Sequence, residues 1–422
     1  MFTSDQKKIL ALSSLGGALE FYDFIIFVFL AKTIGELFFP SSNQIASLMA
    51  TLAVFAIGYL ARPLGGILFG HFGDKFSRKK AFINTVLLMA VPTFLIGCLP
   101  TYHSIGIGAS ILLVTLRLLQ GLSVGGEIPG AIVFAAETVM EKRRGFATGL
   151  ILFGINMGLL AGSFVGAMVT HQLSSDQLMS WGWRIPFFIG GLLGVVSYFM
   201  RKQLNETPAF QLLQTARNKV KLPIKEIFVR HPHKFLQGVT ITALEATIIS
   251  ILFLFMPTYL ATFFHYPLAK LLELNTLSIL IFTVPVLLTS YLSDKIGRKK
   301  LLFIGVIFFS IFVYPLFMLF HSQHFPMVVI VTSLCGLFAS CVAGVFPCTT
   351  AELFPTHVRY SGMAICYNVG FGIVGGLTPL IATWLIGYSG NLLSPSWILM
   401  CFAILSFIAL LFMRETYKTA LE

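Results

Sequence analysis

Gly70-His71-Phe72-Gly73-Asp74-Lys75-Phe76-Ser77-Arg78-Lys79-Lys80 follows one long apolar segment, and Ser293-Asp294-Lys295-Ile296-Gly297-Arg298-Lys299-Lys300 follows another. Both stretches contain Asp-Lys-x-x-Arg-Lys-Lys. A second pair repeats in the same order, because Ala136-Glu137 precedes Arg144 by seven residues and Ala351-Glu352 precedes Arg359 by the same interval. The offsets, 294 − 74 = 220 and 352 − 137 = 215, agree within a short insertion. The repeat predicts two similar halves, as in many membrane transporters.

The composition between these repeats excludes a protein that folds in water. Hydrophobic residues make up 56% of the 422 residues and charged residues 11%, whereas a soluble domain is about 25% charged. The apolar share is about 236 residues, and a membrane-spanning helix needs roughly 20. The chain therefore has room for ten to twelve spans.

Apolar segments and basic loops alternate along the chain. We expect twelve spans, at residues 11–38, 45–73, 82–100, 108–138, 146–170, 184–201, 235–264, 271–292, 301–320, 327–352, 361–388 and 394–413. Of the 29 basic residues, 29 − 5 = 24 fall on one side of this alternation, and the other five are Lys32, Arg62, Arg117, Arg184 and Lys270. Basic loops stay in the cytoplasm, so the net charge of +12 indicates membrane orientation and not nucleic-acid binding.

The predicted architecture is an all-α polytopic membrane protein with two pseudo-symmetric six-helix bundles. Residues 1–201 form the first bundle, 202–233 a polar cytoplasmic linker and 234–422 the second bundle. We expect a monomer in the cell membrane, more specifically a bacterial inner membrane, with the N- and C-termini in the cytoplasm. A glycine at every fourth position, in Gly154, Gly158, Gly162 and Gly166, predicts close packing of another helix against this segment.

Several strings together resemble the major facilitator superfamily, and within it the metabolite:H+ symporters, which include proline/betaine, 2-oxoglutarate, citrate and shikimate carriers. The loop Gly70–Lys79 resembles the superfamily's hallmark motif except that Ser77 replaces a glycine. The other strings are Leu19-Glu20-Phe21-Tyr22-Asp23-Phe24, Arg62-Pro63-Leu64-Gly65-Gly66, Arg117-Leu118-Leu119-Gln120-Gly121, Gly125-Gly126-Glu127, Trp183-Arg184-Ile185-Pro186-Phe187, Glu206-Thr207-Pro208 and Glu352-Leu353-Phe354-Pro355-Thr356. This resemblance implies alternating access to a central site between the two halves.

Six ionisable residues lie inside predicted spans, namely Glu20, Asp23, Arg62, Arg117, Glu127 and Glu245. Each costs about 2.5–3.5 kcal/mol to insert, so each needs a partner or a cavity. At about 1.5 Å per residue, our predicted boundaries place Asp23, Arg62 and Glu127 near the midplane and Arg117 nearer the outer face. The resemblance implies otherwise, because related proton–sugar symporters pair an aspartate and an arginine at positions that match Asp23 and Arg117.

These residues suggest how a proton is coupled to transport. Our hypothesis is that Asp23, with Glu20 or Glu127 nearby, binds the proton, and that Arg117 or Arg62 competes for the same carboxylate. Movement of the arginine between two conformations would then switch proton affinity. The alternative is a permanent structural ion pair.

A second group of residues is predicted to contact the substrate. The positions that match Arg62 and Arg117 in the second half are Phe282 and Thr332, so Glu245 lacks a basic partner there. Glu245 and Arg62 are our charged candidates, and Tyr22, Tyr259, Tyr367 and Asn368 are candidates to line the same cavity or, alternatively, to pack. Four acids against two arginines favour a zwitterion or cation, such as an amino acid or betaine, while an organic acid or a polycarboxylate metal chelator remains open.

The repeated charged motifs are predicted to form a cytoplasmic gate, made of Asp74, Arg78, Glu137 and Arg144 and their counterparts Asp294, Arg298, Glu352 and Arg359. No nucleophile motif or metal-ligand spacing occurs among the histidines and cysteines. The predicted function is therefore a non-enzymatic, proton-driven importer of a small polar metabolite, without cofactor or metal. A facilitative uniporter of the same fold is the alternative.

Overall fold

The computed structural model describes residues 4–66, 68, 78–139, 141–202, 223–322, 324–417 and 419. Helices and their connections account for all of these residues, and no β-strand occurs among them. Backbone polar groups have no water to bind in a bilayer, so helices that satisfy them internally are the expected solution for so apolar a chain.

The first half of the chain contains ten α-helices and two short 3₁₀ turns among the described residues. These are α1 (Ser4–Phe29), α2 (Ala31–Phe38), α3 (Gln44–Leu60), α5 (Arg78–Cys98), α6 (Tyr102–Ile105), α7 (Ile107–Val124), α8 (Glu127–Thr138), η1 (Glu141–Arg143), α9 (Arg144–Gln172), α10 (Ser175–Ser180), η2 (Gly182–Arg184) and α11 (Ile185–Lys202).

The second half begins with a short helix inside the predicted linker. Its elements are α13 (Pro223–Arg230), α14 (Pro232–Ile248), η3 (Ile249–Phe255), α15 (Met256–Phe263), α16 (Leu268–Ile296), α17 (Arg298–Ile311), α18 (Val313–Met318), η4 (Leu319–Ser322), α19 (Phe325–Ala343), α20 (Phe346–Glu352), α21 (Thr356–Tyr367), η5 (Asn368–Gly375), α22 (Gly376–Ser389) and α23 (Ser394–Phe412). Both η3 and η5 are π-helical, and residues 203–222 of the linker lie outside the described residues.

Twelve long helical segments correspond to the twelve predicted spans. Within the described residues, nine continuous helical runs are long and apolar enough to cross a membrane, and α17 with α18 and η4 makes a tenth, bent by 49°. Helix α1, with 26 residues, and α5, with 21, complete the set. The predicted span 11–38 proves to be two helices, since a turn at Leu30 separates α1 from α2.

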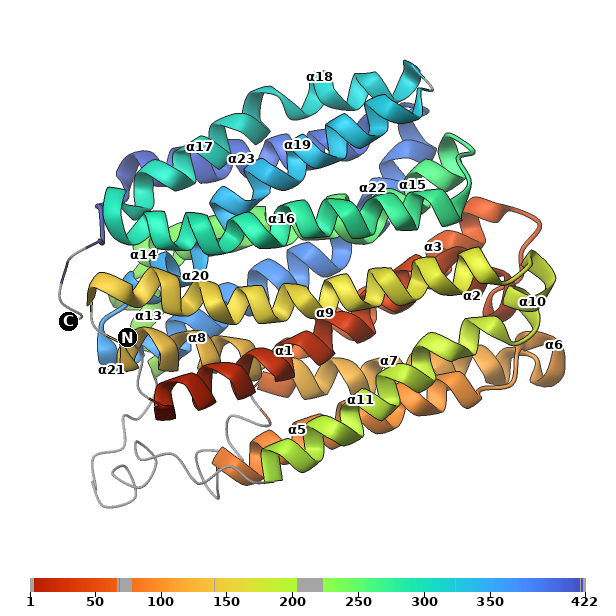
Figure 1. Ribbon diagram of the computed structural model, residues 1–422, viewed down its shortest axis with the longest axis horizontal. Helices are drawn as coiled ribbons and strands as arrows, with labels where there is room; N and C mark the ends of the chain where they lie inside the picture. Colours follow the sequence, from red (N-terminus) through yellow and green to blue (C-terminus); the bar gives the residue numbers. More distant parts are fainter. Residues whose placement is uncertain are drawn as a thin grey trace.

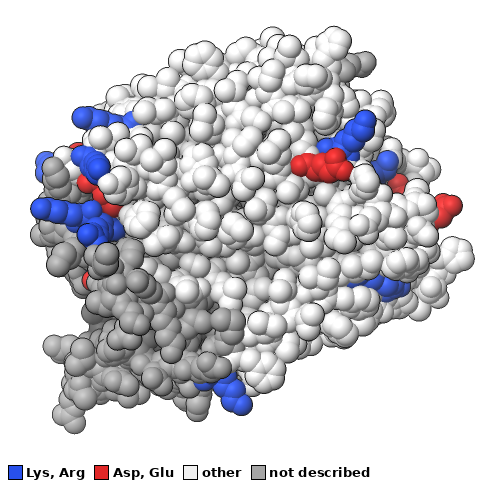
Figure 2. All heavy atoms as spheres, viewed as in Figure 1, with Lys and Arg blue, Asp and Glu red and all other residues white. Residues whose placement is uncertain are grey.

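The long helices lie side by side, and the two chain termini meet at one end of the bundle (Figure 1). We call this the terminal end and the opposite one the distal end. On the face drawn in Figure 2, charged side chains gather toward the two ends, and a broad band between them shows no charge. This distribution fits a molecule whose middle is surrounded by lipid.

Two pairs of helices join the halves along their length. Helix α9 packs against α1 of its own half and against α16 of the other, while α3 packs against α22. Figure 1 shows α9 running between α1 and α16. A hydrogen bond between the hydroxyls of Ser163 and Thr276, 2.8 Å apart, links α9 to α16. We call the α9–α16 and α3–α22 contacts the seam between the halves.

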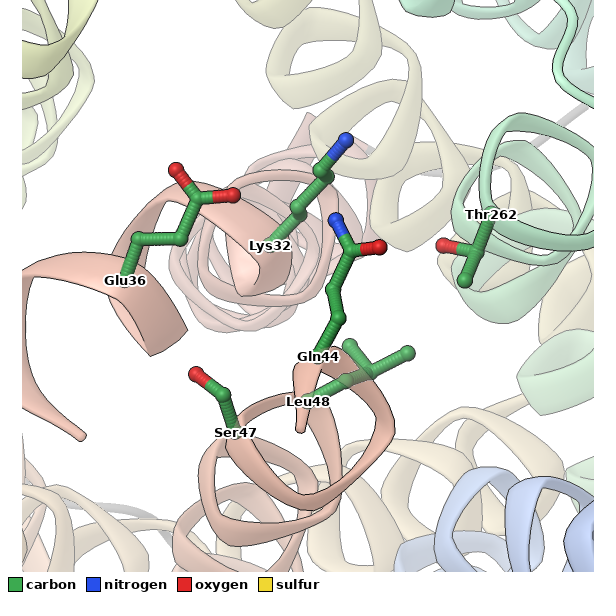
Figure 3. Close-up of a pocket in the computed structure, with 6 residues that line it drawn as sticks. All are labelled: Lys32, Glu36, Gln44, Ser47, Leu48 and Thr262. Carbon is green, nitrogen blue, oxygen red and sulfur yellow. The ribbon is translucent and has the colours of Figure 1, made fainter. Parts of the chain in front are cut away.

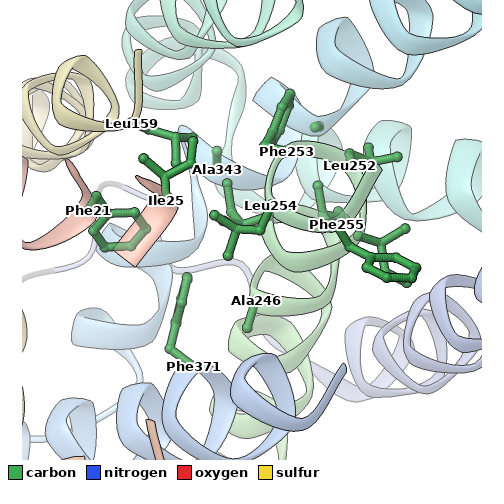
Figure 4. Close-up of a cluster of buried hydrophobic side chains, with 14 of the residues drawn as sticks. Phe21, Ile25, Leu159, Ala246, Leu252, Phe253, Leu254, Phe255, Ala343 and Phe371 are labelled. Carbon is green, nitrogen blue, oxygen red and sulfur yellow. The ribbon is translucent and has the colours of Figure 1, made fainter. Parts of the chain in front are cut away.

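Apolar side chains fill the middle of this seam. Phe21 and Ile25 of α1, Leu159 of α9, Leu254 of η3 and Phe371 of η5 converge there (Figure 4). The rings of Phe21 and Phe371 meet edge to face, with their centroids 6.4 Å apart. Helices from both halves therefore share one continuous core.

The predicted glycine ridge of α9 packs on α1. A methyl group on Gly158 would overlap the carbonyl of Ala18, and one on Gly154 would overlap the side chain of Ser14. At Gly166 the nearest atom, in Phe29, would be 3.4 Å away, which is an ordinary contact. The close approach of α1 and α9 therefore depends on the middle of the ridge and relaxes at its end.

We expect Gly158→Ala to lower the melting temperature of the purified protein by several degrees, because overpacking against a backbone atom costs about 1–3 kcal/mol. Gly166→Ala is the matched control, since it brings the same gain in helix propensity without the overlap. Equal melting temperatures for the two variants in a thermal-shift assay would show that the α1–α9 contact tolerates a methyl group.

Candidate functional site

Asp23, Gln120 and Arg117 form a buried polar cluster between α1 and α7. The Arg117 guanidinium Nη1 lies 3.5 Å from Asp23 Oδ2 and donates to Gln120 Oε1 at 3.0 Å. Gln120 Nε2 donates to Asp23 Oδ2 at 2.6 Å and to the hydroxyl of Thr93 on α5 at 2.8 Å. Asp23 is 1% exposed and Arg117 is fully buried, so each charge depends on the other.

Helical spacing brings these groups together. Arg117 and Gln120 are three residues apart and lie on one face of α7. Phe27, one turn after Asp23 on α1, places its ring 4.2 Å from the Arg117 guanidinium carbon. The aromatic face adds a favourable contact for the cation.

The structure corrects the predicted depth of Asp23 relative to Arg117. Helix α1 begins at Ser4 and not at residue 11, so Asp23 lies 23 − 4 = 19 residues from the terminal end, or about 29 Å. Arg117 lies 138 − 117 = 21 residues from the end of α8, or about 31 Å. The two residues are therefore level, and the error came from placing the start of the first helix too late.

Arg62 takes a different position from Arg117. It is fully buried, and its guanidinium carbon lies 3.8 Å from the ring centroid of Tyr59, three residues earlier on the same helix. A methyl group on Gly372 of η5 would lie within 4 Å of the Tyr59 carbonyl oxygen and of Arg62 Cβ, so this part of the helix packs against the second half. Of the two arginines considered for Asp23, the structure pairs it with Arg117.

Glu245 lies in the middle of a helix of the second half. It is on α14 and is 1% exposed. Neither carboxyl oxygen has a hydrogen-bond partner within the described residues. A buried carboxyl group with unsatisfied oxygens is costly, so Glu245 is the group in the second half that is most in need of an external partner.

Three other predicted residues donate hydrogen bonds to backbone carbonyls. The Tyr22 hydroxyl donates to the carbonyl of Pro186 at 2.9 Å, and that of Tyr259 donates to the carbonyl of Leu392 at 2.6 Å. Asn368 Nδ2 donates to the Gly125 carbonyl at 2.7 Å, across the seam. These polar groups therefore bond to backbone carbonyls, which sequence does not reveal, and their role at the substrate stays a prediction. The Tyr367 ring stacks on Phe371, with centroids 4.5 Å apart, so it remains beside the seam.

Four predicted residues fall wholly or partly outside the described residues. Asp74 is not described, and Arg78 begins α5 but its side chain is not described. The side chains of Glu20 and Glu127, on α1 and α8, are likewise outside the described set. The structure therefore places the other six predicted gate residues only.

Charged groups join the two halves at the terminal end. Arg359 of α21 donates to Glu137 Oε1 of α8 at 2.7 Å. Asp294 of α16 accepts hydrogen bonds from the backbone N–H groups of Gly145 and Phe146, at 2.9 and 2.8 Å. These amides begin α9, where the helix dipole favours a negative charge.

Arg298 pairs with two acids beside these contacts, Asp294 and Glu352. Its Nη1 lies 2.8 Å from Asp294 Oδ1, and its Nη2 lies 3.3 Å from Glu352 Oε1. Arg144 approaches the same Glu352 oxygen from the first half, at 3.8 Å. The second copies of both sequence motifs therefore form one network with residues that flank α9.

The segment after α23 covers this network. Glu415 accepts hydrogen bonds from the backbone N–H groups of Arg298 and Lys299, at 2.9 and 3.1 Å. The Thr416 hydroxyl donates to Glu352 Oε2 at 2.7 Å, and the Thr419 carbonyl accepts from Arg144 Nη1 at 3.0 Å. Sequence reasoning missed these residues, because a polar tail carries no pattern that shows where it folds back.

Gln120 is the other functional candidate that sequence reasoning missed. The string Arg117-Leu118-Leu119-Gln120 did contain a signal, since two polar residues three apart in an apolar helix share a face. Tyr59 and Arg62 are likewise three residues apart, and the Tyr59 ring packs against the Arg62 guanidinium.

Comparisons with known proteins identify the family. The family model described as Major Facilitator Superfamily matches residues 13–289 and 274–421. The Proline/betaine transporter of Escherichia coli (strain K12) is 34% identical over 427 residues, covering 99% of this chain and 85% of that protein. The Putative proline/betaine transporter of Staphylococcus aureus (strain COL) is 35% identical over 418 residues, covering 97% and 88%.

Solved structures show the same fold. The xylose transporter XylE from E. coli, in a partially occluded inward open conformation, has a TM-score of 0.79 at 19% identity, covering 99% of this chain and all of that one. The proton:xylose symporter XylE bound to 6-bromo-6-deoxy-D-glucose has a TM-score of 0.76 at 18% identity, covering 100% and 98%.

The long apolar helices of the described residues, the buried ion pair between Asp23 and Arg117 and these relatives define a polytopic membrane transporter. The chain belongs to the Major Facilitator Superfamily, as its sequence motifs had indicated.

We expect Glu137→Gln to loosen the terminal end, because it removes the negative charge 2.7 Å from Arg359 while keeping the side-chain shape. Cys348 provides the readout, since it is buried beside Glu352, 3.3 Å from Oε1. Its alkylation by a maleimide, followed by mass spectrometry, should become about two- to fivefold faster, as expected for a partly exposed ion pair.

Glu226→Gln is the matched control, because Glu226 pairs with Arg230 on its own helix, α13, at 3.4 Å. An unchanged alkylation rate in Glu137→Gln, or an equal increase in both variants, would argue against a gate held by the Glu137–Arg359 pair.

Proposed function

We propose that this protein is a proton-coupled importer of small zwitterions of the proline and betaine type. The observation that carries the proposal is the buried cluster of Asp23, Gln120 and Arg117, together with the unsatisfied Glu245 in the other half. The names of the relatives support the substrate class. No cofactor is needed, because the proton gradient supplies the driving force.

The proton site would consist of Asp23 with Arg117 as its competitor. In this structure the pair is closed, and Gln120 holds the carboxylate against the arginine. A conformational change that separates α1 from α7 would leave Asp23 in a poorly hydrated site, where the protonated form is favoured. Glu20 and Glu127 remain candidates to assist.

The substrate site would lie between the halves, with Glu245 facing the cationic group of the zwitterion. Arg62, which is buried at the seam on the opposite half, would face its carboxylate. Complementary charges on the two halves would make the zwitterion a bridge between them. This arrangement favours zwitterions over polycarboxylate chelators, which would bring several negative charges toward Glu245.

Alternating access would involve residues 1–201 and 234–422 as two bundles, with residues 202–233 as the cytoplasmic linker. The terminal end is the cytoplasmic one in this proposal, because most basic residues lie there. Asp74, Arg78, Glu137, Arg144, Asp294, Arg298, Glu352 and Arg359 would form its gate. We propose a monomer in the bacterial inner membrane, with both termini in the cytoplasm.

Asp23→Asn should abolish accumulation of labelled proline in proteoliposomes under an imposed pH gradient, because the amide cannot carry the proton. Exchange of labelled for unlabelled proline should persist, since it needs no net proton transfer. Asp176→Asn, an exposed acid on α10, is the control and should accumulate proline like the wild type.

Continued uphill accumulation by Asp23→Asn would exclude Asp23 as the coupling acid. Uptake by the wild type that only equilibrates proline, with or without the pH gradient, would instead establish the facilitative uniporter.

Glu245→Gln should raise the KM for proline and glycine betaine by about tenfold, or about 1.4 kcal/mol, because a hydrogen bond or contact to a charged group contributes about that much. The pH gradient should still drive uptake at saturating substrate. A KM equal to that of the wild type would assign Glu245 to the structure and not to the substrate.

A further inference from the structure

The fourth long helical segment is interrupted where α7 ends and α8 begins. The interruption contains Gly125-Gly126-Glu127-Ile128-Pro129. In a continuous helix the carbonyl of Gly125 would accept the backbone N–H of residue 129, but a proline has no N–H. The sequence therefore leaves a buried main-chain acceptor without its helical donor, and such acceptors normally find another partner.

A side chain of the second half supplies the missing donor. Asn368, where α21 passes into the π-helical η5, donates from Nδ2 to the Gly125 carbonyl at 2.7 Å. The same Nδ2 donates to the Ala364 carbonyl of its own helix at 3.0 Å, which fixes the orientation of the amide. Asn368 is 8% exposed, so both bonds are shielded from water. The acceptor that Pro129 leaves in the first half is thus satisfied from the second half.

Tyr360, about two turns before Asn368 on α21, makes a second bond of the same kind. Its hydroxyl donates to the carbonyl of Gly126, the next residue of the interruption, at 3.1 Å. The helical donor to that carbonyl, the N–H of Gly130, is 3.4 Å away, so the tyrosine adds to a long and weak bond. A methyl group on Gly130 would lie 3.1 Å from the Tyr360 ring, and glycine there lets the ring pack on the first turn of α8.

Neighbouring residues of α21 hold both ends of α8. Arg359 pairs with Glu137, next to the last residue of α8, at 2.7 Å. Tyr360 bonds to Gly126, the residue that caps the start of α8. Figure 1 shows α8 and α21 at the terminal end, where the two helices are in contact. Helix α8 is therefore fixed to the second half at its charged end and at its broken end.

The corresponding interruption of the second half has a donor within that half. Helix α19 ends at Ala343 and α20 begins at Phe346. The Thr289 hydroxyl of α16 donates to the Ser340 carbonyl beside this interruption at 2.7 Å. Because α16, α19 and α20 belong to one half, this bond can persist when the halves separate. The bonds to Gly125 and Gly126 cannot, since their donors and acceptors lie on opposite halves.

The distal end offers a comparison. There Thr258 of α15 donates to the Val28 carbonyl of α1 at 3.3 Å. One turn further along α15, Thr262 lies across a narrow space from Lys32 of α2 (Figure 3), with room for about one water molecule. The bond from Asn368 to Gly125 is shorter, at 2.7 Å, so it is the stronger of the two.

We propose that Asn368 and Tyr360 form a backbone latch, which holds the terminal end closed by donating to the Gly125 and Gly126 carbonyls. When the halves separate at this end, the Gly125 carbonyl loses its donor, and Pro129 prevents α8 from replacing it. Opening therefore carries the cost of an acceptor that has lost its partner. The latch is uncharged, so salt does not screen it as it screens ion pairs. The inference rests on the alternating access proposed above, and it depends on neither the substrate nor the proton.

The test is a double-variant cycle on Asn368 and Pro129, read by maleimide alkylation of Cys348 in the purified protein and mass spectrometry. Cys348 is buried on α20, which packs on α8 of the first half, so opening beside α8 exposes it. We expect Asn368→Ala to speed alkylation about fivefold, the factor that corresponds to one ordinary hydrogen bond. The same factor should be found at low and at high salt.

Pro129→Ala should remove this effect. The variant gives Gly125 a donor within its own segment, because Gly125 and Gly126 both keep right-handed helical angles. In the Pro129→Ala background, Asn368→Ala should change the alkylation rate by less than about twofold, since coupled residues give non-additive effects. Equal increases with and without Pro129→Ala would show that Asn368 does not act through the Gly125 carbonyl, and would overturn the proposal.

Asn156→Ala is the matched control, because Asn156 is also buried and its Nδ2 has no hydrogen-bond partner among the described residues. It should leave the alkylation rate unchanged, and an increase equal to that of Asn368→Ala would overturn the latch.

Tyr360→Phe is the second probe, since it keeps the ring and removes only the hydroxyl. Its bond is partly exposed, so we expect alkylation to become about twofold faster. This variant decides the case if Asn368→Ala does not fold, and an unchanged rate would then refute the latch. The readout needs no transport, so a protein that takes up no zwitterion would refute the proposed function and leave this test intact.

Discussion

The cost of burying a charge in a bilayer controls how this protein is built. Asp23 and Arg117 are both almost completely buried, and neither could stay ionised there alone. Their pairing requires α1 and α7 to lie close, and Gln120 ties the pair to Thr93 of α5. Three helices of the first half are thus fixed around one ion pair. Breaking that pair is expensive unless a proton neutralises the acid, which is the physical basis for coupling proton binding to helix movement.

The cost of burying a charge also applies to the ion pairs at the terminal end. There the Glu137 side chain is 38% exposed, whereas Arg359, Arg298 and Glu352 are buried. The carboxylate of Glu137 can therefore be hydrated when it separates from Arg359, at modest cost. Backbone amides at the start of α9 supply part of the partner charge for Asp294. The tail residues Glu415 and Thr416 add hydrogen bonds to the same network. The contacts that cross between the halves at this end are those of Arg359 with Glu137, of Asp294 with the α9 amides and of Arg144 with Glu352.

Sequence patterns predicted the fold and much of the charge pairing. The repeated Asp-Lys-x-x-Arg-Lys-Lys motif and the apolar segments were sufficient for twelve helices, because lipid leaves a chain few alternatives. Arg298 pairs with Asp294 and Glu352, and Arg359 pairs with Glu137 of the first half, while their role as a gate stays a prediction. The predicted depth of Asp23 was wrong because the polar start of its helix, at Ser4, is not distinguished from a loop by hydropathy. The hydrogen bonds of Tyr22, Tyr259 and Asn368 were not predicted, because their acceptors are backbone carbonyls distant in sequence and no local pattern encodes such a partner.

The two halves differ most where the repeat would place their arginines. The counterpart of Arg62 is Phe282, which packs on Phe253 with ring centroids 4.7 Å apart, and the counterpart of Arg117 is Thr332, whose hydroxyl donates to the Val328 carbonyl at 2.9 Å. The first half therefore compensates its buried acid internally, while the second half leaves Glu245 without a cation of its own. Of these two buried acids, Asp23 has a cationic partner in its own half and Glu245 has unsatisfied carboxyl oxygens within the described structure. In the proposed symporter, Asp23 would bind the proton and Glu245 the substrate. The proposed division of roles rests on this difference: Asp23 has Arg117 as a competitor for the proton, and Glu245 has no hydrogen-bond partner among the described residues.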